Sequence, residues 1–564
     1  MSKLKPKLFS VMKTYTWKQF YKDVISGIIV AIIALPLSIA LAIASGVSPE
    51  RGLYTAIIGG FFVSFLGGSR VQIGGPTGAF MVIVLGVIAD YGLDGLILAT
   101  MIAGVMMILF GLFKLGSVVK FMPYPIITGF TSGIAVVIFT SQVNDFFGMN
   151  ISDLPGEVVG KWLSYFSHLS SIDLTTTLLG VGAFLIILFW PKINKTIPGT
   201  LIAILLTSAA VLIFNLDVPT IGSKYADLSN KFPLPSFPTI TYEKIRTLIE
   251  PAFVIAFLGS VESLLSAVVS DGMIGSRHRS NMELVAQGTA NIASAAFGGI
   301  PVTGAIARTV ANIKNGGRTP VAGMVHSVTL LLIYLLLMPL VKLIPLSALA
   351  AILFVVAINM SEYKEFKAMF KAPSSDTIVM LVTFGLTVLI DLVVAIEVGL
   401  VLSMFLFMKR MSEVSDVSIK KLDFTEETKL ESQMDTQPVL MKKPSVEGVQ
   451  VYQINGPFFF GAAHKYLDAV SQVEKHIEYL IIIMKHVPSM DATALHYLNS
   501  SIKICKTKKI QLILTGTRPG VKATLEKAGY LNEEYHIIFK DNLDQGLAYV
   551  EELKKITQNE KDPN

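Results

Sequence analysis

Charged residues are scarce in this chain, and cysteine is nearly absent. Only 16% of the 564 residues are Asp, Glu, Lys or Arg, whereas a soluble domain usually carries about 25%. Hydrophobic residues make up 52%. The single cysteine, Cys505, excludes a disulfide framework and any cysteine metal site. The composition therefore predicts a protein of the lipid bilayer.

Motifs for catalysis and ATP hydrolysis are also missing. The sequence has no GxxxxGK[ST] phosphate loop, no metal-ligand cluster and no nucleophile motif. We therefore expect no enzyme, no cofactor and no transport driven directly by ATP. The net charge of +6 requires no nucleic-acid partner, because the placement of the cations across a membrane accounts for it.

The charge deficit marks out the domains. It lies within residues 23–410, beyond which Lys, Asp and Glu return. We expect a cytoplasmic N-terminal segment, a transmembrane domain, a linker, a small α/β domain and a polar tail at residues 1–22, 23–410, 411–445, 446–556 and 557–564.

Apolar runs long enough to cross about 30 Å of hydrocarbon recur through the transmembrane domain. Twelve are expected at residues 23–44, 52–67, 93–113, 123–147, 172–190, 197–214, 246–270, 281–298, 320–338, 345–359, 374–391 and 393–410. Two shorter or more polar spans, 77–91 and 304–313, each follow a Gly-Pro break. These fourteen spans form two sets of seven, and an odd repeat forces the halves into opposite orientations.

The basic residues support this topology. The first 22 residues hold six lysines and no acid. With that end in the cytoplasm, 20 cations lie inside, these six lysines included, and 7 lie outside, as the positive-inside rule requires. We expect a multi-pass protein of the cell's inner membrane with both termini cytoplasmic.

The two Gly-Pro breaks nearly repeat each other. Residues 74–80 read GGPTGAF and residues 298–305 read GGIPVTGA, and Gly78 and Gly304 are 226 positions apart. Broken apolar helices at matching places in two halves point to the binding site of a repeat-built transporter. The second break leads to Arg308, a charge that is costly at membrane depth unless it is used.

The C-terminal region alternates strand and helix patterns. Strands are expected at 449–454, 480–484, 510–514 and 536–539, and helices at 463–475, 492–506, 520–528 and 543–553. This alternation predicts a partly parallel sheet covered by helices.

Taken together, these features resemble the SulP family of anion transporters, the bacterial relatives of the solute-carrier sulfate, bicarbonate and chloride exchangers. The resemblance rests on residues 34–37, 74–80, 123–125, 129–133, 262–265, 277–284, 287–288 and 298–309. The C-terminal region resembles a STAS domain through residues 487–493 and 516–529.

The resemblance implies a fold and an assembly. The fold is a polytopic α-helical membrane protein with 14 spans as 7+7 inverted repeats. They form core and gate domains, as in the uracil transporter, and a small cytoplasmic α/β STAS domain follows. The resemblance also implies a homodimer, elevator-type alternating access and a possible cytoplasmic regulator at the STAS domain. Thr493 falls where related STAS domains carry a phosphorylated residue; capping of its helix is the simpler interpretation.

The resemblance places the anion between the starts of the third and tenth spans. A helix start carries a partial positive charge of about +0.5, so two facing starts form an anion site. The alternative is that the glycines only allow close helix packing. The expected substrate-binding residues are Thr77, Gly78, Ala79, Phe80, Gly304, Ala305, Ile306 and Arg308.

Glu262 and Ser266 are the expected coupling-ion residues. The repeat offset maps Glu262 onto Pro36, on the first helix of the other half. A carboxyl group in apolar surroundings favours its protonated form. Bicarbonate-type members carry Asp, Thr and Gly-Ala-Thr where this chain has Glu262, Ser266 and Gly304-Ala305-Ile306. Because Ile306 lacks a hydroxyl ligand for sodium, proton coupling is favoured; an acid that only pairs with Arg308 is the structural alternative.

We therefore expect a proton-coupled secondary transporter of a small, sulfate-class inorganic anion. A sodium-coupled bicarbonate transporter, a dicarboxylate transporter and an uncoupled anion channel or exchanger of the same fold stay open. A nucleobase transporter shares the fold type, but the STAS domain and Arg308 argue against it.

Overall fold

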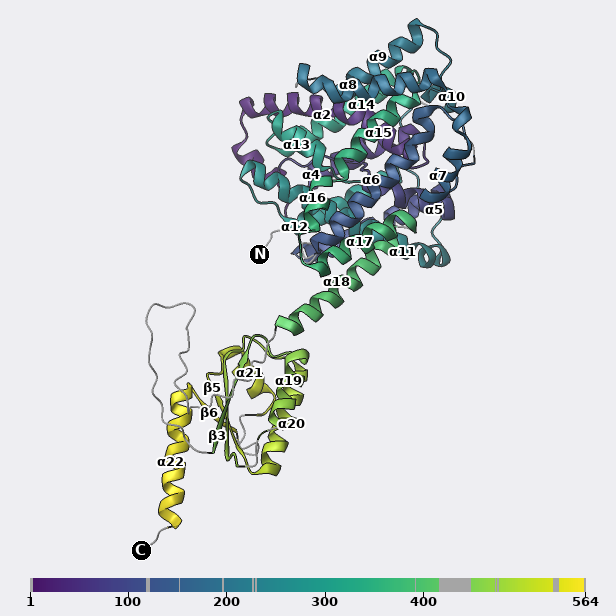
Figure 1. Cartoon of the computed structure of the whole chain (residues 1–564). Helices are drawn as coiled ribbons and strands as arrows, with labels where there is room; N and C mark the ends of the chain where they lie inside the picture. The colour runs from purple at the N-terminus through teal and green to yellow at the C-terminus, as the bar shows by residue number, and fades with distance from the viewer. Residues whose placement is uncertain are drawn as a thin grey trace. The chain divides into compact units, whose positions relative to one another are not determined.

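The structure is a computed structural model of the chain. It describes residues 4–117, 122–151, 153–194, 197–225, 228, 231–390, 392–414, 448–471, 473, 476–530 and 537–561. The expected linker at 411–445 therefore lies almost entirely outside the described residues. The chain divides into two compact units, Met1–Ser403 and Met404–Asn564 (Figure 1).

The first half of the helical unit follows the expected spans closely. A short N-terminal helix α1 (Leu8–Val11) precedes it. Its main elements are α2 (Trp17–Ala44), α3 (Pro49–Tyr54), the π-helical turn η2 (Thr55–Gly59), α4 (Gly60–Leu66), α5 (Ala79–Leu112), α6 (Tyr124–Phe147), α7 (Val158–Ser167), α8 (Leu174–Ile193) and α9 (Gly199–Ile213).

The short helix α10 (Ile221–Lys224) leads to the second half, which repeats this pattern. The elements of the second half are α11 (Tyr242–Ile274), α12 (Ser280–Ala296), α13 (Ile306–Lys314), α14 (Pro320–Val341), α15 (Leu346–Met360), α16 (Tyr363–Met369), α17 (Ser374–Leu389) and α18 (Leu392–Val414). Among the described residues, eight helices are long and apolar enough to cross a membrane, and α9 and α17 are shorter apolar helices.

Local signals explain where these helices begin and end. Thr16 and Thr241 accept hydrogen bonds from backbone N–H groups in the first turns of α2 and α11, as N-cap residues do. Gly148 and Gly275 end α6 and α11 in the left-handed conformation, which glycine adopts without strain. Inside α5, Gly92 has non-helical angles (φ 68°, ψ −174°), so this helix is two spans joined at a kink, as expected.

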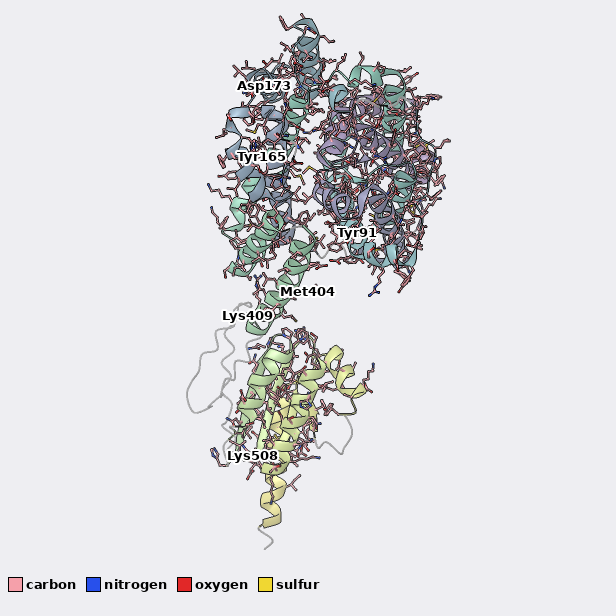
Figure 2. The ribbon with its side chains drawn as sticks, turned by 90° about the vertical axis from the view of Figure 1, so that its right-hand side faces the viewer. Tyr91, Tyr165, Asp173, Met404, Lys409 and Lys508 are labelled. Carbon is pink, nitrogen blue, oxygen red and sulfur yellow. The ribbon has the colours of Figure 1, made fainter. Side chains whose placement is uncertain are left out.

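The helices of this unit form two bundles. The core bundle contains α2, α4, α5, α11, α12, α13 and α14, whose main packing partners are one another. The gate bundle contains α6, α8, α9, α15 and α17. In Figure 2, Tyr165 and Asp173 mark the side of the unit that holds α7 and α8, and Tyr91 of α5 lies on the other side. The two bundles touch mainly through α2, which contacts α9 and α15, and through α5, which contacts α6.

The two Gly-Pro breaks pair with each other. Strand β1 (Gly74–Gly75) and strand β2 (Thr303–Gly304) form a short antiparallel ladder, with Gly74 opposite Gly304 and Gly75 opposite Thr303. The equivalent segments of the two halves therefore run in opposite directions side by side. This is the arrangement that an inverted repeat requires, and it brings the starts of α5 and α13 together.

The C-terminal unit is an α/β domain. Its described strands, in the order β3-β4-β5-β6, are all parallel, whereas the sequence predicted a partly parallel sheet. The elements are β3 (Val449–Asn455), α19 (Phe460–Ser471), β4 (Tyr479–His486), α20 (Ala492–Lys508), β5 (Gln511–Thr515), α21 (Pro519–Lys527), β6 (Ile537–Lys540) and α22 (Leu543–Lys561).

Alternating side chains of this sheet build two hydrophobic clusters. Leu480, Ile482 and Leu512 belong to the larger cluster, with residues of α19, α20 and α21. Val451, Ile481 and Ile513 belong to the smaller one, with Leu547 and Val550 of α22. Because successive residues of a strand face opposite sides, helices cover both faces. Helix α22 continues to Lys561, past the expected domain end at 556.

Candidate binding site between two helix starts

The paired breaks place two helix starts next to each other. Helix α5 begins at Ala79 after Gly78, and α13 begins at Ile306 after Ala305. The first N–H groups of a helix have no carbonyl partner within it. Ala305 N–H, which precedes α13, donates to the carbonyl of Ile73 at 2.8 Å. This bond ties the start of α13 to the first break.

Polar side chains lie against the backbone of two glycines. A Cβ atom at Gly304 would lie 1.4 Å from Nε2 of Gln72, and one at Gly75 would lie 1.9 Å from Nη1 of Arg308. Both distances are far inside van der Waals contact. The glycines of the breaks therefore make room for Gln72 and Arg308, a more specific role than general helix packing.

Arg308 is buried at the site and only partly satisfied. Its side chain is 3% exposed. Nη2 donates to Oγ of Ser38 on α2 at 3.3 Å, and Nη1 has no hydrogen-bond partner among the described residues. A buried guanidinium with a free donor is costly unless an anion pairs with it. This arrangement suits Arg308 to bind a negatively charged ligand.

Glu262 lies beside the start of α5. Its Oε2 accepts a hydrogen bond of 2.9 Å from Oγ1 of Thr77. Thr77 belongs to the first break and Glu262 to α11, so the bond links the helix start to the neighbouring core helix. In the described part of the chain, no ion pair joins Glu262 to Arg308. Pairing between these two residues, the structural alternative for Glu262, is therefore not present in this conformation.

Ser266 lies one turn further along α11 and is 1% exposed. Its hydroxyl donates to Oγ1 of Thr309 at 3.4 Å, and the same Thr309 oxygen accepts from the N–H of Ile73 at 3.1 Å. Ser266 thus contacts α13 and, through it, the first break. It does not share a hydrogen bond with Glu262.

The remaining expected residues divide between backbone and packing roles. Ala79 and Phe80 are buried, and the tip of the Phe80 ring lies 3.1 Å from the Cβ position of Gly259 on α11. The ring thus packs inside the core bundle, so only the backbone of Phe80 is available to a ligand. Ile306 is 42% exposed and presents an apolar side chain at the start of α13.

The gate bundle supplies an apolar wall opposite the start of α5. The Cβ position of Gly78 lies 3.0 Å from Cδ1 of Ile138 on α6 and 3.2 Å from Sδ of Met360 on α15. The site is therefore bounded by polar groups of the core bundle on one side and by apolar groups of the gate bundle on the other.

Several buried polar residues that the sequence did not single out hold the breaks in place. The N–H of Gly304 donates to Oγ of Ser263 at 3.1 Å. Asn291 on α12 donates to the Val302 carbonyl at 2.8 Å and accepts from its N–H at 3.0 Å. Ser263 and Asn291 could have been found as polar residues inside apolar spans, because a buried polar group needs a specific hydrogen-bond partner.

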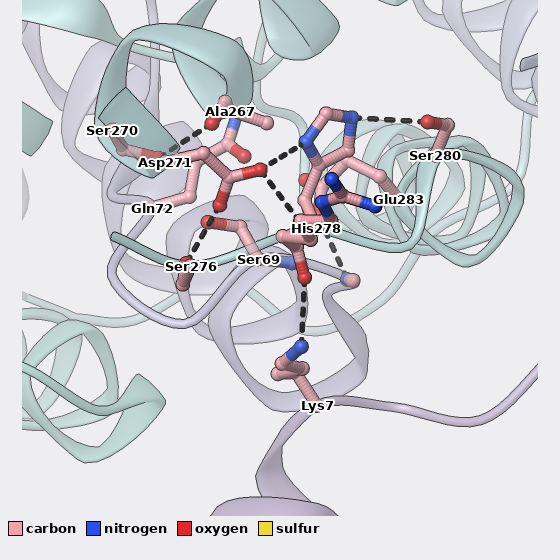
Figure 3. Close-up of polar contacts among 12 residues, drawn as sticks. Lys7, Ser69, Gln72, Ala267, Ser270, Asp271, Ser276, His278, Ser280 and Glu283 are labelled. Atoms are coloured by element: carbon pink, nitrogen blue, oxygen red, sulfur yellow. Dashed lines mark hydrogen bonds and ion pairs between the residues drawn. The ribbon is translucent and has the colours of Figure 1, made fainter. Parts of the chain in front are cut away.

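Asp271 and His278 lie away from the site, at the C-terminal end of α11 (Figure 3). The Oδ2 atom of Asp271 lies 2.7 Å from Nδ1 of His278, and its Oδ1 accepts from Ser276. Arg277 takes part through its carbonyl, which accepts from Lys7 at 2.8 Å. These contacts fasten the N-terminal segment to the α11–α12 loop.

Two further titratable residues are buried in the core bundle. Glu283 is fully buried and accepts from the N–H groups of Gly68 and Ser69 at 2.7 and 2.9 Å. His326 on α14 is also fully buried, and neither ring nitrogen has a partner in the described part of the chain. The described residues contain no group of three or more His, Cys, Asp or Glu that could hold a metal ion.

Comparison with known proteins extends these observations. The model of the sulfate permease family matches residues 20–383, and that of the STAS domain matches residues 441–545. The candidate sulfate transporter YvdB of Bacillus subtilis (strain 168) is 42% identical over 535 residues, which cover 94% of this chain and 98% of YvdB. The bicarbonate transporter BicA of Picosynechococcus is 33% identical over 516 residues, covering 90% of each chain.

Solved structures agree with the fold. The anion transporter Slc26a9 of mouse, solved in its inward-facing state, superposes with a TM-score of 0.84 at 17% identity, covering 97% of this chain and 94% of that chain. The transmembrane domain of a cyanobacterial BicA superposes with a TM-score of 0.62 at 32% identity, covering 68% of this chain and 98% of that domain.

Proposed function

Because the chain belongs to the sulfate permease family, we propose that it is a proton-coupled secondary transporter of a small inorganic anion of the sulfate class. The observation that carries the proposal is the buried Arg308, whose free Nη1 lies beside the ladder that joins two helix starts. One full and two partial positive charges converge there, and within the described residues no acid pairs with Arg308.

Glu262 couples the proton to the anion through Thr77. When Glu262 is ionised, it takes the O–H hydrogen bond of Thr77. When Glu262 is protonated, it can donate to the Thr77 oxygen, which frees the Thr77 O–H to turn toward the anion. Protonation therefore adds a donor to the site and removes a repelling negative charge. Both effects make proton binding and anion binding mutually favourable.

Transport proceeds by an elevator-type movement of the core bundle against the gate bundle. Both helix starts, Arg308 and Glu262 belong to the core bundle, so they can travel together past the apolar wall of α6 and α15. The chain lies in the cell's inner membrane with both termini in the cytoplasm, as the distribution of lysine and arginine favours. It works as a homodimer with one site in each protomer, and the STAS domain contributes to the contact and offers a surface to a cytoplasmic regulator.

The test is sulfate uptake into proteoliposomes, with imposed proton or sodium gradients. Wild type should accumulate sulfate when the outside is more acidic. Glu262→Gln should abolish this accumulation while sulfate exchange at equal pH survives, because glutamine keeps the shape but cannot titrate. Proton-driven accumulation by Glu262→Gln would show that Glu262 is structural.

The same assay separates the alternatives. Uptake of bicarbonate driven by sodium alone would replace the proposal with a sodium-coupled bicarbonate transporter, the activity for which BicA is named. Uptake of a dicarboxylate in place of sulfate would identify a dicarboxylate transporter. Flux that never exceeds the anion's own gradient would identify an uncoupled channel or exchanger.

A further inference from the structure

A cavity of about 640 Å³ separates the two bundles on the side of α8 and α9. Helices α2 and α13 of the core bundle form one wall, and α8, α9 and α15 of the gate bundle form the other. The lining residues on which the argument rests are Ile29, Ile33, Ile187, Leu188, Lys314 and Asn359.

The polar groups of this cavity gather at one end. Lys314 and Asn315 lie at the C-terminal end of α13, Asn359 lies near the end of α15, and Thr200 lies at the start of α9. The apolar lining residues of α2 lie deeper along that helix. At 1.5 Å per residue, Ile29 and Ile33 are about 10 and 16 Å further along α2 than Lys22. The cavity thus has a polar mouth at the face where α2 begins and an apolar interior.

The charge at the mouth is positive. Lys314 lines it directly. The Lys22 side chain lies 3.8 Å from the Cβ position of Gly316, next to Asn315. Both lysines are exposed, and none of the described residues that line the cavity is acidic. Asn315 and Asn359 add amide donors beside these charges.

We propose that this cavity binds one anionic phospholipid, with its phosphate at Lys314 and one acyl chain against Ile29, Ile33, Ile187 and Leu188. The depth supports this occupant, because about 16 Å from Lys22 to Ile33 matches one leaflet of a 30 Å hydrocarbon layer. Lysines near a membrane surface attract anionic headgroups. A soluble inorganic anion would use the mouth but would leave the apolar interior unfilled.

The bound lipid lies between parts that must move if the bundles shift against each other. Ala311, which lines the cavity, is on the same short helix as Ile306 and Arg308. An acyl chain between α13 and α8 therefore resists their approach. The amount of anionic lipid then regulates movement of the core bundle, whatever substrate the site carries.

Lipid retention by the full-length protein tests this inference without a transport assay. The protein is reconstituted in phosphatidylcholine nanodiscs that contain a minority of phosphatidylglycerol, and retained lipids are counted by native mass spectrometry after release into mild detergent. Wild type should retain phosphatidylglycerol selectively. Lys314→Gln should reduce its retention about fivefold, the effect of one lysine near an anionic surface. Ala311→Trp should reduce it by filling the cavity while Lys314 stays in place.

The matched control is Lys367→Gln, which removes an exposed lysine of α16 that does not line the cavity. It should retain lipid as wild type does. Equal retention by wild type and Lys314→Gln, equal retention of phosphatidylcholine and phosphatidylglycerol, or displacement of the lipid by inorganic sulfate would each overturn the inference. Because Lys314 is exposed, its substitution should leave the thermal unfolding of the protein unchanged, which checks that the variant is folded.

Discussion

Gly75→Ala should weaken anion binding by moving Arg308, although it changes neither a charge nor a hydrogen-bonding side chain. The new methyl group would lie 1.9 Å from Nη1 of Arg308. Since carbon contacts settle near 3.5 Å, the guanidinium must retreat by about 1.5 Å. It is the far end of a flexible side chain, so the fold should accommodate this movement.

The cost follows from Coulomb's law. For an anion about 4 Å from the guanidinium, the attraction at an effective dielectric constant of about 20 is ~4 kcal/mol, and at about 5.5 Å it is ~3 kcal/mol. The loss of ~1 kcal/mol raises Kd about sixfold. Isothermal titration or scintillation proximity binding of labelled sulfate to purified protein at constant ionic strength measures this change.

The matched control is Gly86→Ala on α5, where an added Cβ meets nothing within 4 Å. It should bind sulfate as wild type does. The decisive experiment is a double-mutant cycle with Arg308→Ala, because Gly75→Ala should have no further effect once the guanidinium is gone. Additive losses in the double variant, or unchanged affinity in the single variant, would refute the reasoning.

Three further predictions concern residues outside the site. Glu283→Ala should lower the thermal unfolding temperature, because the N–H groups of Gly68 and Ser69 lose their buried acceptor at about 1–3 kcal/mol each; a melting curve equal to wild type would contradict this. Burial raises the pKa of the Cys505 thiol from 9.0 to about 11, so alkylation by N-ethylmaleimide at pH 8 should be about a hundredfold slower than in urea. Because the folded state holds the proton more tightly, this thiol's contribution to stability is lost as the pH rises from about 9 to about 11. Rapid labelling of the native domain would argue against the raised pKa and against this loss of stability. Asp491→Ala should destabilise the STAS domain by about 1 kcal/mol in chemical denaturation, since Asp491 caps α20 by accepting from Ala494 at 2.7 Å, and an unchanged midpoint would exclude the cap.

The positions of the elements could be predicted from the sequence because their signals are local. The apolar runs, the Gly-Pro breaks and the alternation of strand and helix lie within a few residues of the elements that they specify. Gly92 is an example: it separates two expected spans and is the kink of α5. The resemblance placed the starts of the two half-helices together, but the sequence did not predict that β1 and β2 pair as an antiparallel ladder.

The contacts of the side chains could not be predicted in this way. Whether Glu262 meets Arg308 or Thr77 depends on the rotation of α11 against its neighbours, which one sequence does not specify. The contact of Gln72 with Gly304 likewise depends on how the segments are placed in space, which the sequence does not specify. The N-terminal lysines predict an orientation in the membrane, but the backbone of this segment also accepts hydrogen bonds from Arg279, at the carbonyl groups of Lys5 and Pro6. These contacts join residues 185 to 274 positions apart and leave no local pattern.

The ladder between β1 and β2 has a thermodynamic consequence for a carrier. Backbone hydrogen bonds hold the starts of α5 and α13 at a fixed separation, so the proposed binding site moves as one unit. If the core bundle carries it past the gate bundle unchanged, the ladder contributes equally to anion affinity on both sides of the membrane. Any net pumping must then originate in a group whose occupancy differs between the two compartments. With the geometry held constant by the ladder, the direction of transport becomes a property of the medium on each side.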